Sequence, residues 1–395
     1  MGRGEVEQLY PVMVERRRYL HRHPELSFKE QETSAFIADV LQKAGVEMRT
    51  KVGGNGVVGI IKGSLPGPVV ALRADMDALP IQDEKNTDYK SEVPGVMHAC
   101  GHDGHTAVLL ALAEYFAGRR DLIRGEIRLL FQPAEEVCPG GALPMINEGA
   151  LDGVDVIYGV HLWTPIPVGT AASAPGPMMA STDEFFVDIH GRGGHGGMPH
   201  KTIDSVVAGS ALVMQLQSIV SRSVNPLDPA VVTIGSFHAG TVQNVIAERC
   251  RLAGTVRCFN ETSRELIRER IASVVEHTAS SYGASASLEY VPGYPPLVND
   301  NEETARFFKV AGGLEGIKTE LTQPIMPAED FAYYLQRVPG CFILVGAGNP
   351  EKGAEYPHHH PKFDLDEEAM GHAARILIAL AENYMQEWPQ PASAE

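Results

Sequence analysis

The stretch that decides the fold class is Ile-Arg-Leu-Leu-Phe-Gln-Pro-Ala-Glu-Glu, residues 127–136. Its first half is a short apolar run that predicts a buried β-strand, and Pro133 ends the run. Similar patterns predict further strands at residues 57–61, 69–72 and 154–160, and a helix at residues 106–116. Strands that alternate with helices favour an α/β domain with a largely parallel sheet.

A second pattern begins near Ser181. Strands are predicted at residues 184–189, 231–237, 248–259 and 285–291, and helices at residues 204–221 and 262–281. The order strand, helix, strand, strand, helix, strand is that of a ferredoxin-like module. We therefore predict an inserted domain, residues 183–292, within a larger domain built from residues 1–182 and 293–395.

Composition excludes several classes of function. The chain has 395 residues with 50 acidic and 33 basic side chains, a net charge of −17, which disfavours nucleic acid and anionic membranes as partners. The sequence has no uninterrupted apolar stretch of membrane-spanning length, and residues 1–18 lack the apolar core of a signal peptide. Its five cysteines are scattered, so we expect a cytoplasmic protein rather than a disulfide-bonded secreted one.

The segment Met-His-Ala-Cys-Gly-His-Asp-Gly-His, residues 97–105, indicates a metal site. Thiolate and imidazole together suit zinc or another borderline-soft divalent cation. Cys100 and His102 are the ligand candidates, because they point to the same side if the segment is extended. His105 falls within the predicted helix, and a structural role is expected for it.

Further polar side chains follow the predicted strands at the edge where open α/β sheets bind ligands. Glu135 and Glu136 follow one strand, and in such a pair one carboxylate can bind a metal while the other acts as a base. His161 ends the next strand and is either a ligand or an ordinary polar residue. Asp75 and Asp77 follow a third strand, where one could orient a metal-bound imidazole.

The inserted module carries polar residues of its own. His195 lies in a glycine-rich segment, His-Gly-Arg-Gly-Gly-His-Gly-Gly, residues 190–197, which could reach across a cleft or simply form a flexible loop. Asn244 and Arg257 could also meet a substrate, and the guanidinium group of Arg257 suits a carboxylate. A G-x-G-x-x-G match at residues 54–59 precedes a strand instead of following one, which argues against a nucleotide-dependent oxidoreductase.

Taken together, these motifs resemble the amidohydrolase branch of the co-catalytic metallopeptidase superfamily, which includes hippurate hydrolases, N-acyl-amino-acid aminoacylases, bacterial carboxypeptidases and auxin-conjugate hydrolases. The matching stretches are HRHPELSF, LRADMDALP, MHACGHDGH, FQPAEE, GVHLW, GRGGHGGMPH, TVQNVI, GTVRCF, AEDFAYY and HHHPKFD. They follow the family's order over almost the whole chain. The resemblance implies a phosphorylase/hydrolase-like α/β catalytic domain with an inserted ferredoxin-like domain that acts as a lid and dimerises.

The resemblance also implies roles for individual residues. The implied ligands of a two-metal centre are Cys100, His102, Glu136, His161 and His359. Glu135 is the implied base and Asp77 orients a ligand, with Asp75 as a second such residue where related proteins have a histidine. His195 is implied to reach the substrate from the inserted domain.

The function implied is hydrolysis of the amide bond of N-acyl-amino acids. Two divalent cations are expected, with zinc first and manganese, cobalt or nickel as alternatives, in a homodimer or homotetramer. A dipeptidase or carboxypeptidase with the same centre is the alternative within the enzyme class. A metal-dependent binding protein without catalysis is the alternative outside it, although Glu135 is present.

Overall fold

The computed structural model describes residue 6 and residues 8–389. Contacts divide the chain into two units. The first comprises residues 1–176, 298–323 and 330–395, and the second residues 177–297 and 324–329. The predicted domain boundaries, after residues 182 and 292, fall inside the second unit, and the prediction assigned residues 324–329 to the other domain.

The first unit is built on an eight-stranded sheet of order β1-β2-β4-β3-β5-β16-β6-β15. Its strands are β1 (Glu47–Val52), β2 (Gly56–Lys62), β3 (Leu65–Asp75), β4 (Arg124–Gln132), β5 (Val156–Pro167), β6 (Thr170–Ser173), β15 (Lys318–Leu321) and β16 (Gly340–Gly348). The ladders among β4, β3, β5 and β16 are parallel.

The prediction of a largely parallel sheet was incomplete, because the sheet is mixed. The ladders β1–β2, β2–β4 and β16–β6 are antiparallel. Strand β1 was not predicted, since its sequence Glu-Met-Arg-Thr-Lys-Val is mostly exposed and lacks an apolar run. Gly53 and Gly54, both at positive φ, form the tight turn that joins β1 to β2.

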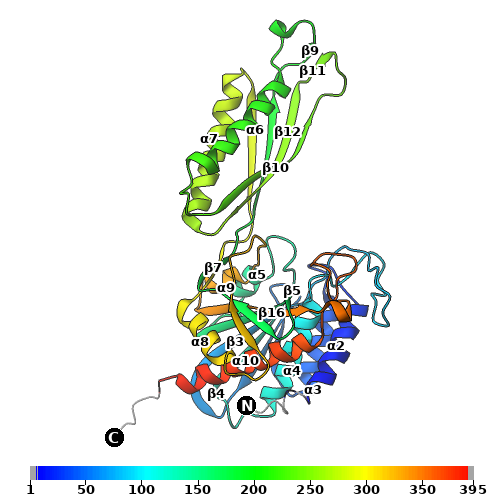
Figure 1. Ribbon diagram of the computed structural model, residues 1–395, viewed down its shortest axis with the longest axis vertical. Coiled ribbons are helices and arrows are strands. Elements are labelled where there is room, and N and C mark those ends of the chain that lie inside the picture. The colour runs from blue at the N-terminus through cyan, green and yellow to red at the C-terminus, as the bar shows by residue number, and fades with distance from the viewer. Residues whose placement is uncertain (1–5, 7, 390–395) are drawn as a thin grey trace. The chain divides into compact units, whose positions relative to one another are not determined.

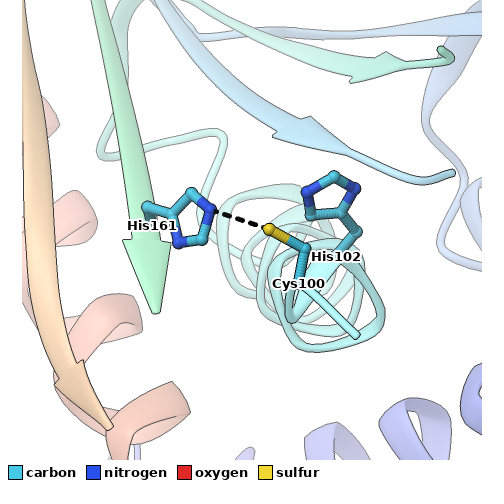
Figure 2. Close-up of side chains that lie close together, drawn as sticks. All are labelled: Cys100, His102 and His161. Atoms are coloured by element: carbon cyan, nitrogen blue, oxygen red, sulfur yellow. Dashed lines mark hydrogen bonds between the residues drawn. The ribbon is translucent and has the colours of Figure 1, made fainter. Parts of the chain in front are cut away.

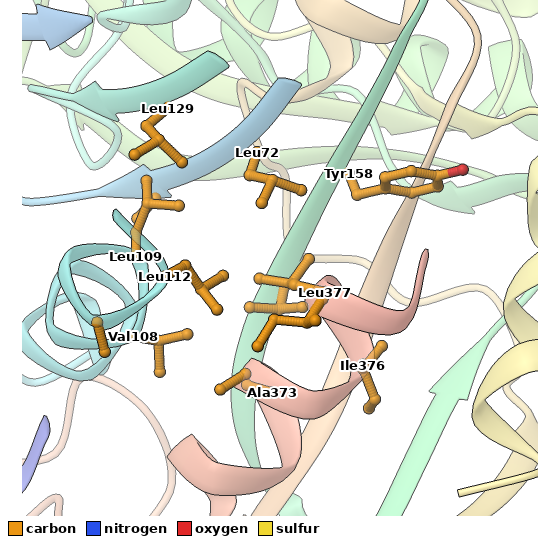
Figure 3. Packing of buried hydrophobic residues seen from close by; sticks show 14 of the residues in the cluster. Leu72, Val108, Leu109, Leu112, Leu129, Tyr158, Ala373, Ile376 and Leu377 are labelled. Atoms are coloured by element: carbon orange, nitrogen blue, oxygen red, sulfur yellow. The ribbon is translucent and has the colours of Figure 1, made fainter. Parts of the chain in front are cut away.

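Helices pack against this sheet, and the hydrophobic core of the unit lies between the helices and the sheet. They are α2 (Tyr10–Arg22), α3 (Gln31–Lys43), α4 (His102–Ala117), α5 (Ala142–Asn147), α8 (Asn301–Ala311), α9 (Ala332–Leu335) and α10 (Glu368–Glu387). Figure 3 shows α4, through Leu109 and Leu112, and α10, through Leu377, packed beside Leu72 of β3. This packing fixes the start of α4 beside the ends of β3 and β5.

The second unit contains a four-stranded antiparallel sheet of order β10-β12-β8-β13. Its elements are β8 (Asp183–His190), α6 (Ser205–Arg222), β10 (Ala230–Ala239), β12 (Arg249–Cys258), α7 (Glu261–Ser281) and β13 (Ser285–Pro292). Helices α6 and α7 cover one face of this sheet (Figure 1). The element order and the strand order are those of the ferredoxin-like module predicted from the sequence.

Short elements complete the chain. Strands β9 (Gly194–His195) and β11 (Val245–Ile246) pair with each other at one end of the second unit (Figure 1). Strands β7 (Gly176–Met179) and β14 (Leu297–Asn299) lie where the chain passes between the units. Among the helices of the described residues, none has both the length and the hydropathy needed to cross a bilayer.

Candidate metal centre

The ends of parallel strands bring the predicted site residues of the first unit together. Asp75 is the last residue of β3 and pairs with Gln132, the last residue of β4. Glu135 and Glu136 follow β4, and His161 lies on the neighbouring strand β5. The sequence argument that strand ends share one sheet edge therefore describes the arrangement of these side chains.

Cys100 and His102 reach the same edge from the start of α4. The segment is not extended, because Gly101 at a φ of 91° turns the chain and the helix begins at His102. Even so, the Cys100 Sγ atom lies 3.5 Å from Nε2 of His161, and His102 stands beside them (Figure 2). Potential ligand atoms of these three residues lie within 4.8 Å of one another.

In addition to a group of Asp75, His102 and His105, two groups share residues with this one. Ligand atoms of Cys100, Glu136 and His359 lie within 4.8 Å of one another, as do those of His102, Glu135 and Glu136. The three groups together contain all five predicted ligands and the predicted base. Most of these side chains are buried, whereas His359 is exposed and approaches Glu136 with a distance of 3.3 Å between Nε2 and Oε1.

Both buried imidazoles turn Nε2 toward the centre. His102 Nδ1 lies 3.0 Å from the Asp77 carbonyl oxygen and 3.2 Å from Asp77 Oδ1, and His161 Nδ1 lies 3.0 Å from the Leu162 carbonyl oxygen. Nε2 of His102 is buried and makes no hydrogen bond within the described part of the chain. A backbone or carboxylate partner on one ring nitrogen, with the other nitrogen left to a cation, is the arrangement of metal-binding histidines. The residues therefore fit a divalent metal.

The charges of this centre favour a cation. Burial by itself lowers the pKa of His102, but the nearby carboxylates, Asp75 first, raise it to about 10. Burial and the carboxylates of Glu136 and Glu135 raise the pKa of the Cys100 thiol well above its ordinary value. The side chains alone thus concentrate negative charge, which a bound cation would balance.

The two adjacent glutamates occupy different positions. Oε1 of Glu136 lies 3.8 Å from Nε2 of His102, and Oε2 of Glu135 lies 4.0 Å from the same nitrogen. Only Glu136 belongs to the group that contains Cys100 and His359. Glu136 therefore belongs both to the group of Cys100 and His359 and to the group of His102, and Glu135 lies beside it.

Both carboxylate oxygens of Asp77 contact neighbouring polar groups. Its Oδ1 faces His102 Nδ1, while its Oδ2 accepts hydrogen bonds from Ser27 Oγ at 2.6 Å and from the backbone N–H of Glu136 at 3.0 Å. These contacts keep the pKa of Asp77 below its ordinary value against the effect of burial. Asp77 therefore contacts two of the candidate ligands without belonging to the ligand groups itself.

Asp75 contacts His105 and also borders the centre, because its Oδ2 lies 3.8 Å from Nε2 of His102. The backbone N–H of Leu162 donates to His105 Nε2 at 2.8 Å, so the proton of that ring lies on Nδ1 and is donated to Asp75 Oδ1 at 2.6 Å. Arg73 donates to Asp75 Oδ2 at 2.6 Å and to Asp330 Oδ1 at 2.9 Å. The sequence analysis did not identify Arg73 or Asp330, although an arginine within an otherwise apolar strand was a usable signal.

The predicted residues of the second unit lie at two places. His195 on β9 pairs with Val245, and the backbone N–H of Gly196 donates to the Asn244 carbonyl oxygen at 2.8 Å, so His195 and Asn244 are neighbours. Both are exposed. Arg257 lies near the far end of β12, eight residues beyond Arg249, which at the rise of a β-strand is about 26 Å. Within one chain these residues do not form a single binding site.

Comparisons with known proteins agree with this arrangement. An N-acyl-L-amino acid amidohydrolase of Geobacillus stearothermophilus is 47% identical over 301 residues, covering 76% of this chain and 81% of that protein. Thermostable carboxypeptidase 1 of Saccharolobus solfataricus is 40% identical, covering 96% of this chain and 97% of that protein. The crystal structure of Bacillus subtilis YXEP protein, described as a dinuclear metal binding peptidase from the M20 family, has a TM-score of 0.84 and 36% identity, covering 96% of this chain and 99% of that one.

The range of residues that match a protein-family model identifies the family of this chain. Residues 71–383, which include the ends of β3, β4 and β5 and the loop that carries His359, match peptidase family M20/M25/M40. The chain belongs to this family and is a hydrolase that acts on amide bonds.

Proposed function

We propose that the protein hydrolyses the amide bond of N-acyl-amino acids and releases a carboxylic acid and a free amino acid. The observation that carries the proposal is the position of Glu135 and Glu136, of which one is grouped with Cys100 and His359 and the other lies beside it. The similarity to the N-acyl-L-amino acid amidohydrolase of G. stearothermophilus supports the choice of substrate class.

We assign five side chains as ligands of two divalent cations: Cys100, His102, Glu136, His161 and His359. Zinc is the first choice because the set combines a thiolate with imidazoles, and manganese, cobalt or nickel are alternatives. The similar YXEP structure is described as a dinuclear metal binding peptidase, which supports the proposal of two cations. When bound, they would polarise the scissile carbonyl group and make a water molecule more acidic.

In this proposal the chain's own residues move the protons. Glu135 takes a proton from the attacking water and later returns it to the leaving amine. Asp77 holds the His102 ring by its Nδ1 atom, and Asp75 holds the His105 ring. His195 donates a hydrogen bond to the oxygen that becomes negative as the carbonyl carbon is attacked.

We further propose that the site is completed by a second copy of the chain in a homodimer or homotetramer. His195 and Asn244 lie about 26 Å or more along the second unit from Arg257, so one small substrate cannot contact all three from one chain. Two chains related by a twofold axis could supply them to one site from opposite directions. Asn244 and Arg257 are our candidates for holding the substrate carboxylate or acyl carbonyl group.

A substrate panel tests the function. Purified enzyme is assayed with acetyl- and benzoyl-amino acids and with unblocked dipeptides, before and after removal of metal by a chelator and after its return. We expect hydrolysis of the acylated amino acids, loss with the chelator and recovery with the cation. Preference for unblocked dipeptides would instead favour a peptidase, in keeping with the name of the S. solfataricus relative.

A further inference from the structure

A buried glutamate outside the metal centre contacts the segment that carries the base. Glu30 directly precedes α3, a position from which short polar side chains such as Asp or Ser accept hydrogen bonds from the first N–H groups of the helix. Its side chain makes no such bond. Glu25 accepts them instead, from the N–H of Glu32 at 3.2 Å and of Thr33 at 2.8 Å. Glu30, which is completely buried, is therefore free to bind elsewhere.

The contacts of Glu30 are all polar and specific. Its Oε1 accepts hydrogen bonds from the backbone N–H of Phe28 at 2.9 Å and from that of Ala134 at 2.8 Å, and its Oε2 accepts one from Asn55 Nδ2 at 3.0 Å. Burying a carboxylate is costly, and burial raises the pKa of Glu30. The hydrogen bonds to backbone N–H groups offset this cost, and the Oε1 acceptor in turn holds the two donors in place.

Both backbone donors have a conformation that residues other than glycine avoid. The φ of Phe28 is 66° and that of Ala134 is 54°, in the left-handed region where the Cβ atom is crowded. Ala134 is the residue at which the chain turns between Pro133 and Glu135. Such a conformation persists only where the surroundings hold it, and it concentrates at functional sites.

The two peptide N–H groups on either side of Glu135 are thus held by two different carboxylates. Glu30 accepts from the N–H of Ala134, and Asp77 accepts from the N–H of Glu136 at 3.0 Å. Two anchored neighbours fix the backbone of the residue between them. We propose that Glu30 is a positioning residue for Glu135, which holds Ala134 in its left-handed conformation and so directs the base toward the reacting water.

This proposal rests on the proposed role of Glu135 as the base. Two substitutions of Glu30 distinguish an effect of side-chain length from an effect of charge. Glu30→Gln keeps an acceptor oxygen at the same distance, and the half-buried Asn55 can turn its amide to suit the new NH₂ group. Glu30→Asp keeps the charge but is one methylene shorter. We expect kcat of Glu30→Asp to fall about tenfold or more and that of Glu30→Gln to stay within about threefold of wild type, with KM and metal content unchanged in both.

Hydrogen exchange gives a measurement that does not depend on activity. Exchange of the backbone amides of residues 134–136, followed by mass spectrometry, should be about tenfold faster in Glu30→Asp and unchanged in Glu30→Gln. A fall of kcat in Glu30→Gln equal to that in Glu30→Asp, or unchanged exchange in Glu30→Asp, overturns the proposal. If Glu135 were not the base, the exchange result would still appear and only the kinetic result would fail.

Relief of the strained conformation provides a rescue. Glycine adopts positive φ without a steric cost, so Ala134→Gly should restore at least half of the kcat lost in Glu30→Asp. Phe28→Gly is the matched control, because Phe28 has the same conformation and the same acceptor but does not adjoin Glu135. Equal rescue by the two glycines, or none by Ala134→Gly, contradicts the proposal. If Glu30→Asp is too unstable to purify, Glu30→Asp is introduced into the Ala134→Gly variant and compared with that variant, where turnover slowed by about tenfold or more would contradict the proposed route through Ala134.

Discussion

The two units hold their candidate functional residues in opposite ways. In the first unit, His102, Asp77 and Asp75 are buried, and each makes hydrogen bonds that fix its ring or carboxylate. In the second, His195 and Asn244 are exposed at the tip around β9 and β11. The candidate side chains of the first unit are therefore fixed by buried contacts, whereas the exposed ring of His195 accepts a hydrogen bond from the nearby N–H of Gly197 at 3.0 Å.

A substitution of Glu135 provides the strongest test of this contrast between the two units. We expect Glu135→Gln to lower kcat by about 10²–10⁴-fold, because the amide cannot take a proton from water. Metal content, measured by elemental analysis, should stay at the wild-type level. Glu136→Gln is the matched control and should lose metal. If Glu135→Gln lost metal instead, Glu135 would be a ligand and the assignment of the pair would be reversed.

The next effect concerns the thiol of Cys100. A metal-bound thiolate is shielded, so we expect alkylation of Cys100 to be at least about tenfold slower in the metal-loaded protein than after chelation. The labelling rate is followed by peptide mass spectrometry. Cys138, which is exposed, is the internal control and should react at similar rates in both forms. Equal rates at Cys100 would count against its ligation.

The sequence indicated which candidate site residues of the first unit lie together, but it did not show that those of the second unit lie apart, for a physical reason. Ligand-type residues at strand ends, such as Glu136 and His161, must meet because parallel strands end at one edge, and the motif around Cys100 lies at the adjoining helix start. Arg257 and His195 also lie in recognisable motifs. Their separation, however, depends on the position of each along its strand and on the length of β12, which a search for motifs does not consider.

Other features had no sequence signal at all. Glu30 has the place of a helix cap, and only the structure reveals that Glu25 takes over this role and that Glu30 binds the N–H of Ala134. The positive φ of Ala134 was equally hidden, because alanine gives no indication of a left-handed turn. Strand β1 was missed because its side chains are mostly exposed and polar. Local patterns identify candidate ligands more readily than the buried residues that contact the same segments.

A smaller effect tests whether the exposed residues act on a second chain. Subunits with Glu135→Ala and subunits with His195→Ala are unfolded, mixed in equal amounts and refolded together. If His195 acts in the partner's site, each mixed dimer has one intact site, and because half of the dimers are mixed, about a quarter of wild-type activity should return. Activity no greater than the sum of the parents, with mixed dimers verified by native mass spectrometry, would place His195 in its own chain's site.

The smallest expected effect concerns the contribution of the buried carboxylate of Asp364 to the free energy of unfolding. Arg17 donates to Asp364 Oδ1 at 2.6 Å and Tyr89 donates to Asp364 Oδ2 at 2.7 Å. Although burial opposes it, Arg17 and Lys85 lower the pKa of Asp364 below its ordinary value. A carboxylate with a lowered pKa contributes stability above the pKa of the unfolded chain, about 3.9, and this contribution is lost as the pH falls through the folded-state pKa.

We therefore expect Asp364→Asn to lower the free energy of unfolding by about 1–3 kcal/mol at pH 7, while turnover of the folded enzyme changes little. The difference from wild type should persist to about pH 5 and shrink below about pH 4, where the wild-type carboxyl group also becomes protonated. Urea unfolding at a series of pH values measures this, with Asp121→Asn at an exposed position as the control. A gap that stays constant down to the lowest pH at which both proteins fold would show that hydrogen bonding, rather than the charge of Asp364, provides the stability. A fall in kcat at full metal content would show instead that the contacts of Asp364 also affect the metal centre.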